Sequence, residues 1–253
     1  MGTHPRRRFR WEDASIEELS AAAREELAAF WVRRAVGEWQ VGRILAELRD
    51  LLASVGAPPA VRALTLGAPA EEGRHGAWCL RLARLYAGRP LARPVVPAAV
   101  LPGFWGAEAR LRAVYGVTVV SCIHETIATT WLLRCFQRCT APLPRGILRA
   151  MLQDETGHAR IGWAYLASPG VTPEDRMALR RRLPKLLGDN VAAWRPRPFV
   201  HGPPDGQGVL CPAEHVDVVR TAVAEIVLPG FAEIGIVSAR ETARLSAVLT
   251  EVG

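Results

Sequence analysis

Two copies of one short motif constrain the fold of this chain more than any other feature. A glutamate is followed three residues later by a histidine at Glu72 and His75, and again at Glu155 and His158. On an α-helix, side chains three positions apart lie on the same face, so each pair can reach one metal ion. Each copy is also preceded directly by an acid. The repeated motif therefore predicts two helices whose ligand faces point inward.

A single glutamate upstream of each motif completes the pattern. Glu38 precedes the first motif with 33 residues between, and Glu125 precedes the second with 29. One glutamate from each of two helices, with a Glu-x-x-His pair from each of two others, is a ligand set found in the core of four-helix bundles. We therefore expect six metal ligands. They are Glu38, Glu72, His75, Glu125, Glu155 and His158.

The first long helix offers several glutamates, and burial decides between them. Glu38 lies on a stripe of apolar or small residues, so its charge must be buried and needs a partner. The alternatives carry signs of a solvated face, since four come as adjacent pairs and the fifth has an arginine one turn before it. These alternatives are Glu17, Glu18, Glu25, Glu26 and Glu47.

Apolar periodicity and helix-ending signals predict an all-α chain. Long helices are expected at about 15–52, 59–86, 107–139 and 144–167. A capping box, Ser15-x-x-Glu18, is expected to begin the first helix, and Pro69 to kink or interrupt the second. The proline-rich residues 89–105 lack helical period and predict a long crossover, which lets the second and third helices run parallel.

The rest of the chain predicts additional C-terminal helices. One is expected from Thr172 to Trp194, and a last helical region from 211 to 249 with a break at Pro229 and Gly230. The whole order divides into three expected parts. Residues 1–14 would be a flexible basic arm, residues 15–170 the four-helix bundle, and residues 171–253 a helical extension packed on the bundle.

Composition excludes several other classes. The net charge of +7 comes almost entirely from arginines spread along the chain, which argues against nucleic-acid binding. No apolar run approaches the roughly 20 residues that span a bilayer. The basic N-terminus has no apolar stretch after it, so we expect no secretory signal and a cytoplasmic protein. The five cysteines predict buried, reduced thiols; Cys135 and Cys139 lie one helical turn apart, but no second pair completes a zinc set.

The expected ligand set determines the chemistry. Four carboxylates and two imidazoles suit iron, or alternatively manganese, better than zinc. Two divalent ions would balance the four negative charges and allow the set to be buried, and such a metal pair can bind dioxygen and supply two electrons. Small residues near the ligands are expected to leave room for oxygen or substrate. They are Gly42, Gly76, Ala128, Thr129, Ala159 and Gly162.

Four neighbouring residues are candidates for supporting roles. Asp154 is expected to accept the free N–H of a ligating histidine. Glu71 could do the same or lie on the surface. Tyr165, two turns after His158, is a candidate electron relay or plain core. His124 adjoins Glu125 but is turned about 100° away on an α-helix, so at most a supporting role is expected.

Between about Arg33 and Leu166 these motifs resemble the ferritin-like di-iron carboxylate proteins. Residues 55–59 (VGAPP) and 122–126 (CIHET) also look like stretches of uncharacterised bacterial ferritin-like domain proteins. The resemblance implies a ferritin-like four-helix bundle and a dinuclear iron site held by the six ligands given above. The chain lacks the Cys-x-x-Cys pair of rubrerythrins, and its two Glu-x-x-His motifs depart from classical ferritins. The spacing also resembles that of the arylamine N-oxygenases, but Met151 stands where those enzymes have an extra histidine.

The sequence thus predicts a dinuclear iron oxidase or oxygenase. It would use dioxygen and an electron donor protein or reductant to oxidise a small organic substrate, which the resemblance does not select. The alternative is a non-catalytic ferritin-like metal-binding or scaffold protein, for which a closed core without a cavity is expected. The arginine-rich surface and long helices permit a homodimer.

Overall fold

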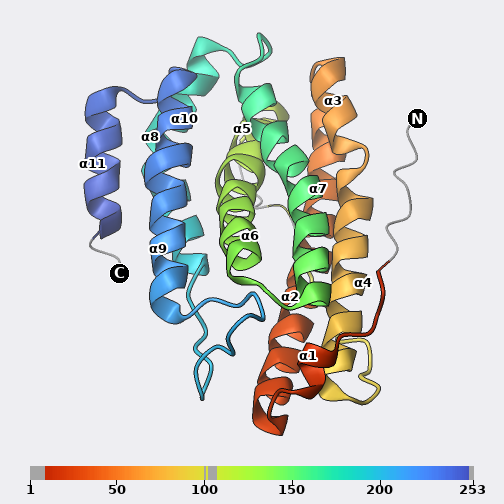
Figure 1. Ribbon diagram of the computed structural model, residues 1–253. Coiled ribbons are helices and arrows are strands. Elements are labelled where there is room, and N and C mark those ends of the chain that lie inside the picture. The colour runs from red at the N-terminus through yellow and green to blue at the C-terminus, as the bar shows by residue number, and fades with distance from the viewer. Residues whose placement is uncertain (1–8, 100, 102–106, 251–253) are drawn as a thin grey trace.

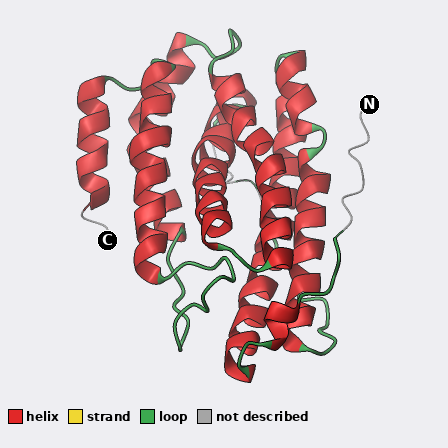
Figure 2. Ribbon diagram, viewed as in Figure 1, coloured by secondary structure: helices red, strands yellow, loops and turns green. Residues whose placement is uncertain are grey.

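The computed structural model describes residues 9–99, 101 and 107–250. Those residues form helices and no strand (Figure 2), so the predicted all-α class is confirmed. Four long helical segments make a bundle (Figure 1). They are α2 (Ala21–Ser54), α4 (Ala68–Ala87), the continuous helix of α5 (Ala109–Val117), η1 (Thr118–Glu125) and α6 (Thr126–Arg138), and α7 (Pro142–Leu166).

The start of the first helix differs from the prediction. Asp13 caps a single turn, α1 (Ala14–Glu17), by accepting a hydrogen bond from the backbone N–H of Ser15. The long helix α2 begins only after Ser20, whose hydroxyl accepts from the N–H of Ala23. The predicted capping box of Ser15 and Glu18 is therefore wrong, because an aspartate two residues earlier already satisfies the N–H groups there.

The second helix is interrupted, as predicted, and the crossover follows it. A short α3 (Pro59–Thr65) precedes α4, and Pro69 lies in the first turn of α4, where its missing N–H costs no hydrogen bond. Gly88 ends α4 in a left-handed conformation, with φ of 63°. Residues 89–99 are not helical, and α4 and the α5–α6 helix run in the same direction (Figure 1), as a long crossover requires.

The third helix contains a feature that the sequence pattern did not predict. Residues Thr118–Glu125 form a π-helix, η1, between α5 and α6. In a π-helix each N–H bonds to the carbonyl five residues back, so the turn is wider than in an α-helix. Such segments are rare and often occur at functional sites. Here the π-helix ends on Glu125, one of the expected ligands.

The C-terminal helices pack on the bundle. A capping box of Thr172 and Asp175 starts α8 (Pro173–Ala193), which contacts α5 and η1. Next, α9 (Pro212–Ala222), η2 (Val223–Val227) and α10 (Leu228–Glu233) form one continuous helix beside α6 (Figure 1). The last helix, α11 (Ala239–Thr250), contacts α10 at the outer edge.

The predicted break at Pro229 and Gly230 is wrong. The helix continues through both residues and ends at Glu233, with Ile234 as its C-cap and Gly235 following with φ of 73°. Pro229 lies in the first turn after the π-helix η2, and Gly230 packs against the indole ring of Trp163 from α7. The packing of the glycine, which lies far from Trp163 in sequence, explains its presence inside a helix.

The first residues that the structure describes pack on α4. Residues 1–8 of the expected basic arm lie outside the described residues. Phe9 contacts Trp78 with ring centroids 5.2 Å apart, and the guanidinium carbon of Arg81 lies 4.1 Å from the ring centroid of Trp11. Aromatic packing therefore ties residues 9 and 11 to the bundle.

One helix within the described residues is long and apolar enough to cross a membrane. It is Ala109–Arg138, and 72% of its most apolar window is buried inside the fold. The burial is that of a core helix, because its apolar side chains already face the other helices of the bundle.

Two apolar clusters fill the bundle, one on each side of the expected ligands. On α2, α4 and α7, the ligand positions separate the residues of one cluster from those of the other, and on the third helix the change falls just after Glu125, between Ile127 and Trp131. The first cluster reaches the ligand layer with Leu45, Ala68, Ile127 and Ile161, and the second with Ala35, Cys79, Trp131 and Met151. The polar residues therefore form one layer between two apolar ones.

Gly162 provides a test of the helix packing. A Cβ atom at this position would lie 2.6 Å from Cys122 Sγ and 2.8 Å from the Val117 carbonyl oxygen. We expect Gly162→Ala to lower the free energy of unfolding by about 1–3 kcal/mol, because the contact involves backbone that must move. At Gly157 in the same helix, a Cβ atom would have no packing neighbour within 4 Å among the described residues, so Gly157→Ala should raise the free energy of unfolding by about 0.5–1 kcal/mol. Urea denaturation followed by circular dichroism compares the two, and equal effects would contradict the packing.

Candidate metal centre

The six expected ligands lie together in the centre of the bundle. Each is at most 4% exposed. They come from all four long helical segments: Glu38 from α2, Glu72 and His75 from α4, Glu125 from η1, and Glu155 and His158 from α7. The other glutamates of the first helices stay outside; Glu25, for example, pairs with Arg89 and Glu47 accepts from the Leu101 N–H.

The six residues form two overlapping sets. Glu38 and His75 make one set with Glu72 and Glu155, and Glu125 and His158 make the other with the same two glutamates. Within each set the ligand atoms all lie within 4.8 Å of one another. Each set therefore has its own histidine and its own glutamate, and the sets share Glu72 and Glu155.

Both imidazoles turn the same nitrogen toward the shared glutamates. His75 Nδ1 lies 3.4 Å from Glu155 Oε1 and 3.6 Å from Glu72 Oε2. His158 Nδ1 lies 2.8 Å from Glu72 Oε1 and 3.0 Å from Glu155 Oε2. The Nδ1 atoms are thus the ones that could ligate a metal.

The other ring nitrogen of each histidine, Nε2, lies next to one of the two acids that precede the motifs. Each acid contacts the histidine of the other helix and not that of its own motif. Asp154 of α7 lies 3.1 Å from His75 Nε2, and Glu71 of α4 lies 3.0 Å from His158 Nε2. Arg74 is 3.6 Å from both acids. An Nε2–H that donates to a carboxylate leaves Nδ1 as the acceptor and fixes the direction of the ring. Asp154 therefore has the expected geometry, and Glu71, left open by the sequence, has the same one.

The charges of the cluster strongly perturb one another. Burial, followed by the neighbouring Glu155, raises the pKa of Glu125 well above its usual range. Burial and the neighbouring Glu155 and Glu38 raise the pKa of Glu72 to about 7. Burial opposes ionisation of Glu155 as well, but hydrogen bonds from His158 and His75 hold its pKa well below normal.

The histidines respond in the opposite sense to burial. Despite desolvation, Asp154 and Glu155 raise the pKa of His75, and Glu155 and Glu71 raise that of His158. Without a metal, protons on these groups compensate the buried carboxylates.

The residues present fit a metal ion. Among the described residues, no well-directed hydrogen bond reaches either carboxylate oxygen of Glu72, Oε1 of Glu125 or Nδ1 of His75, although all four atoms are buried. Buried polar atoms without partners are costly, and a cation bound by all of them would satisfy them. The cluster therefore has the residue composition of a metal site, and its buried oxygen and nitrogen atoms are free to ligate a metal ion.

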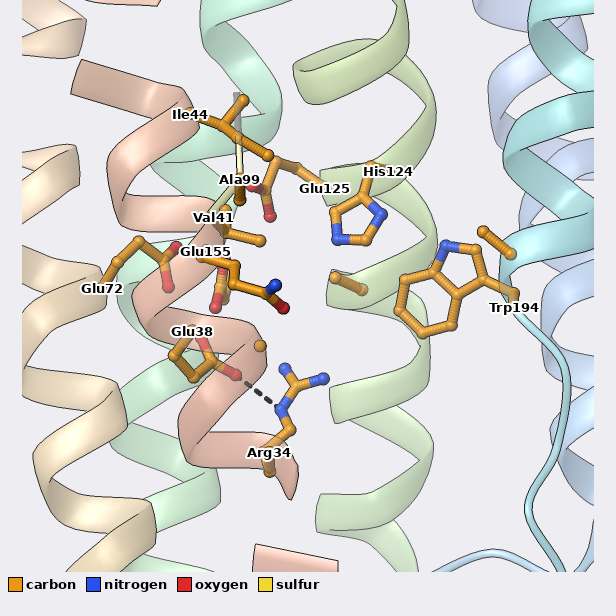
Figure 3. Close-up of a pocket in the computed structure, with 14 residues that line it drawn as sticks. Arg34, Glu38, Val41, Ile44, Glu72, Ala99, His124, Glu125, Glu155 and Trp194 are labelled. Carbon is orange, nitrogen blue, oxygen red and sulfur yellow. Dashed lines mark ion pairs between the residues drawn. The ribbon is translucent and has the colours of Figure 1, made fainter. Parts of the chain in front are cut away.

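A cavity of about 440 Å³ opens directly onto the cluster. Figure 3 shows the carboxylates of Glu38, Glu72 and Glu155 gathered on one side, and His124 and Trp194 facing them. Apolar side chains such as Val41 and Ile44 complete the wall. The cavity therefore combines a reactive polar end with an apolar interior.

Arg34 lines this cavity and was missed by the sequence analysis. Its guanidinium Nε forms an ion pair with Glu38 Oε1, one helical turn further along α2 (Figure 3). The side chain is 18% exposed, and its guanidinium carbon lies 4.9 Å from the ring centroid of Trp131. The spacing of four residues between Arg34 and Glu38 places the two side chains one helical turn apart, and this is the feature of the sequence that predicts the ion pair.

His124 also lines the cavity, which its neighbour Glu125 reaches as well. Its ring centroid lies 5.1 Å from that of Trp194. Burial and the charge of Arg34 lower its pKa to about 4, so it is neutral at physiological pH. The sequence predicts at most a supporting role for His124, and in the structure it lines the cavity without belonging to either ligand set.

The remaining candidates have different surroundings. Tyr165 is buried in the apolar core, and its charged neighbours are Asp175 and Arg110 rather than the ligands. Of the small residues, Ala128 lines the cavity, but the space at Gly76 is filled by the indole of Trp39, and that at Gly162 by η1. Those two glycines allow close helix packing and do not leave the expected room. All five cysteines are free thiols, four of them buried.

Comparison with known proteins supports the fold. Neither a family model nor a curated protein matches the chain. Among solved structures, it is similar to a protein from Synechococcus described as having aldehyde deformylating oxidase activity. The TM-score is 0.57 and the identity 19%, over 89% of this chain and 96% of the other. The predicted ferritin-like helical-bundle fold is thereby confirmed.

The pKa shifts predict how the stability of the metal-free protein depends on pH. Glu125 has a raised pKa, so the folded state holds its proton at a pH where the unfolded state has lost it. Folding then takes up a proton, and stability must fall as pH rises. We expect the free energy of unfolding, measured with urea in the presence of a chelator, to decrease from pH 7 to pH 8.

The isosteric variant Glu125→Gln removes this titration and should make the pH dependence shallower. Glu225→Gln, on the exposed side of η2, provides the matched control and should leave the slope unchanged. Equal slopes for Glu125→Gln and the wild type would contradict the proton uptake.

Proposed function

We propose that this protein is a dinuclear iron oxidase or oxygenase. It would use dioxygen and an external electron donor to oxidise a small organic substrate. The observation that carries the proposal is the pair of overlapping ligand sets that share Glu72 and Glu155. Each set would hold one ion through its own histidine and glutamate. The two shared glutamates would be available as ligands for either ion.

Charge and ligand chemistry support two divalent ions. Four ionised carboxylates in a buried layer repel one another, and two ions of charge +2 would cancel their charge. Oxygen ligands combined with imidazoles suit iron, or manganese as the alternative metal, better than zinc. When bound, a pair of iron ions would supply the electrons for reduction of dioxygen.

The residues around the ligands have separate tasks in this proposal. Asp154 and Glu71 hold the two imidazoles with Nδ1 directed inward. The apolar wall of Val41 and Ile44 would exclude water from the bound substrate. His124, neutral and next to Glu125, is available to hold or pass a proton at the edge of the cavity.

The cavity favours this function over the alternative of a non-catalytic metal-binding or scaffold protein. A scaffold would need no space beside its ligands, whereas here about 440 Å³ lie next to four of the six. The volume is in the range of pockets that bind small molecules. The oxidase activity of the structural neighbour agrees with the same reaction class, and the 19% identity leaves the substrate to be determined.

Metal analysis tests the proposal. Protein expressed with iron supplied should contain about two iron ions per chain, as expected for this ligand set. The double variant Glu72→Ala/Glu155→Ala loses both shared ligands and should retain almost none. Glu225→Ala, a glutamate exposed on η2, should keep the full content. A wild type that folds but holds no tightly bound metal would refute the proposal.

Asp154→Asn tests the contact with His75. The amide cannot accept an N–H hydrogen bond as strongly as a carboxylate, so the hold on the imidazole weakens. We expect the metal affinity to fall by about 10–100-fold, measured by competition with a chelator, while the number of ions at saturation is unchanged. An affinity equal to that of the wild type would mean that Asp154 does not orient the ring.

A further inference from the structure

We infer that the substrate of this site carries a carboxylate, which binds Arg34, and an apolar or aromatic body that extends through the cavity. This inference rests on the proposed function, because it depends on what happens to Arg34 when the ligands hold metal. It adds a substrate class that the ligand set and the fold do not specify.

Arg34 is a charged group at the boundary between the ligands and the cavity. Figure 3 shows its guanidinium entering the cavity beside Glu38, and the two form an ion pair. The acids whose charge acts on Arg34 are Glu38 and Glu155, and both are expected ligands. The outer acids, Asp154 and Glu71, contact the histidines and Arg74 instead.

Metal binding would remove the partner of Arg34. A metal ion held by Glu38 and Glu155 takes up the negative charges that face the guanidinium. Arg34 is only 18% exposed, and a largely buried cation without a counter-charge is costly. An incoming anion would restore the balance. The planar fork of a guanidinium matches a carboxylate, to which it can donate two parallel hydrogen bonds.

A second cavity supports an anionic substrate. It measures about 170 Å³ and shares Arg34 and Trp194 with the larger cavity beside the ligands, which we call the metal cavity. The two cavities therefore meet at Arg34. Its wall includes Arg33, Arg195 and Arg197, and in the part of the chain that the structure describes none of these three pairs with an acid. Unpaired arginines around an opening attract anions and raise their local concentration.

The same wall indicates the body of the substrate. Phe30, Trp131 and Phe199 line the second cavity beside the arginines. Their rings offer flat apolar surface, and Val41, Ile44 and Ala128 continue it in the metal cavity. A small carboxylic acid with an apolar or aromatic body therefore fits both the charge and the surface, whereas inorganic phosphate fits the charge alone.

Calorimetric titration with benzoate tests this inference. The ferrous protein is kept free of dioxygen, and its metal content is measured on the same samples. Benzoate should bind, and benzyl alcohol and inorganic phosphate should bind at least about tenfold more weakly, since each lacks one of the two recognised features. Arg34→Gln should weaken benzoate binding by about tenfold or more.

Arg62→Gln makes the same chemical change at an exposed position of α3 that lines neither cavity, and it should alter the affinity by less than about threefold. If Arg34→Gln with full metal content binds benzoate as tightly as the wild type, the inference is wrong. Equal binding of benzyl alcohol or phosphate would also overturn it.

The metal-free protein separates this inference from the proposed function. In the metal-free protein Glu38 forms an ion pair with Arg34, so benzoate should bind weakly. Glu38→Gln frees Arg34 without any metal and should tighten benzoate binding by about tenfold. A wild type that holds no metal, together with this gain in Glu38→Gln, would refute the metal centre and support the anion site. No gain in Glu38→Gln would refute the anion site whatever the metal content.

Discussion

The burial of four carboxylates in one layer is the constraint on which the rest of the structure depends. Glu38, Glu72, Glu125 and Glu155 lie within the bundle between two apolar clusters, each at most 4% exposed. Burial and mutual repulsion penalise their charges, so the layer needs protons or cations. Burial of the apolar clusters on the two sides of the layer contributes favourable free energy of folding, which offsets the cost of burying the carboxylates.

The surrounding residues orient the side chains of this layer so that they can ligate a cation. Each outer acid crosses to the histidine of the other motif: Asp154 to His75 and Glu71 to His158. The crossing ties α4 to α7 on both sides of the shared glutamates. It also leaves Nδ1 of each ring directed toward those glutamates, so the fold orients the ligands through contacts between helices.

The two sides of the ligand layer have different surroundings. On one side the outer acids and Arg74 surround the histidines. On the other side the glutamates face a cavity with Arg34 and His124 in its wall. In the proposed function, a substrate would reach the glutamates through this cavity.

The sequence by itself determined the all-α class, the long crossover, the interruption near Pro69 and the six residues that meet in the layer. These follow from local rules: helical period, capping and breaking residues, and the same-face spacing of Glu72 with His75 and of Glu155 with His158. Only the tertiary structure decided the π-helix η1, the exchange of Asp154 and Glu71, the cavity position of Arg34 and His124, and the continuation of the last long helix through Gly230. Each of these depends on contacts between residues far apart in the chain, whose free energy outweighs the local preference on which sequence patterns rest.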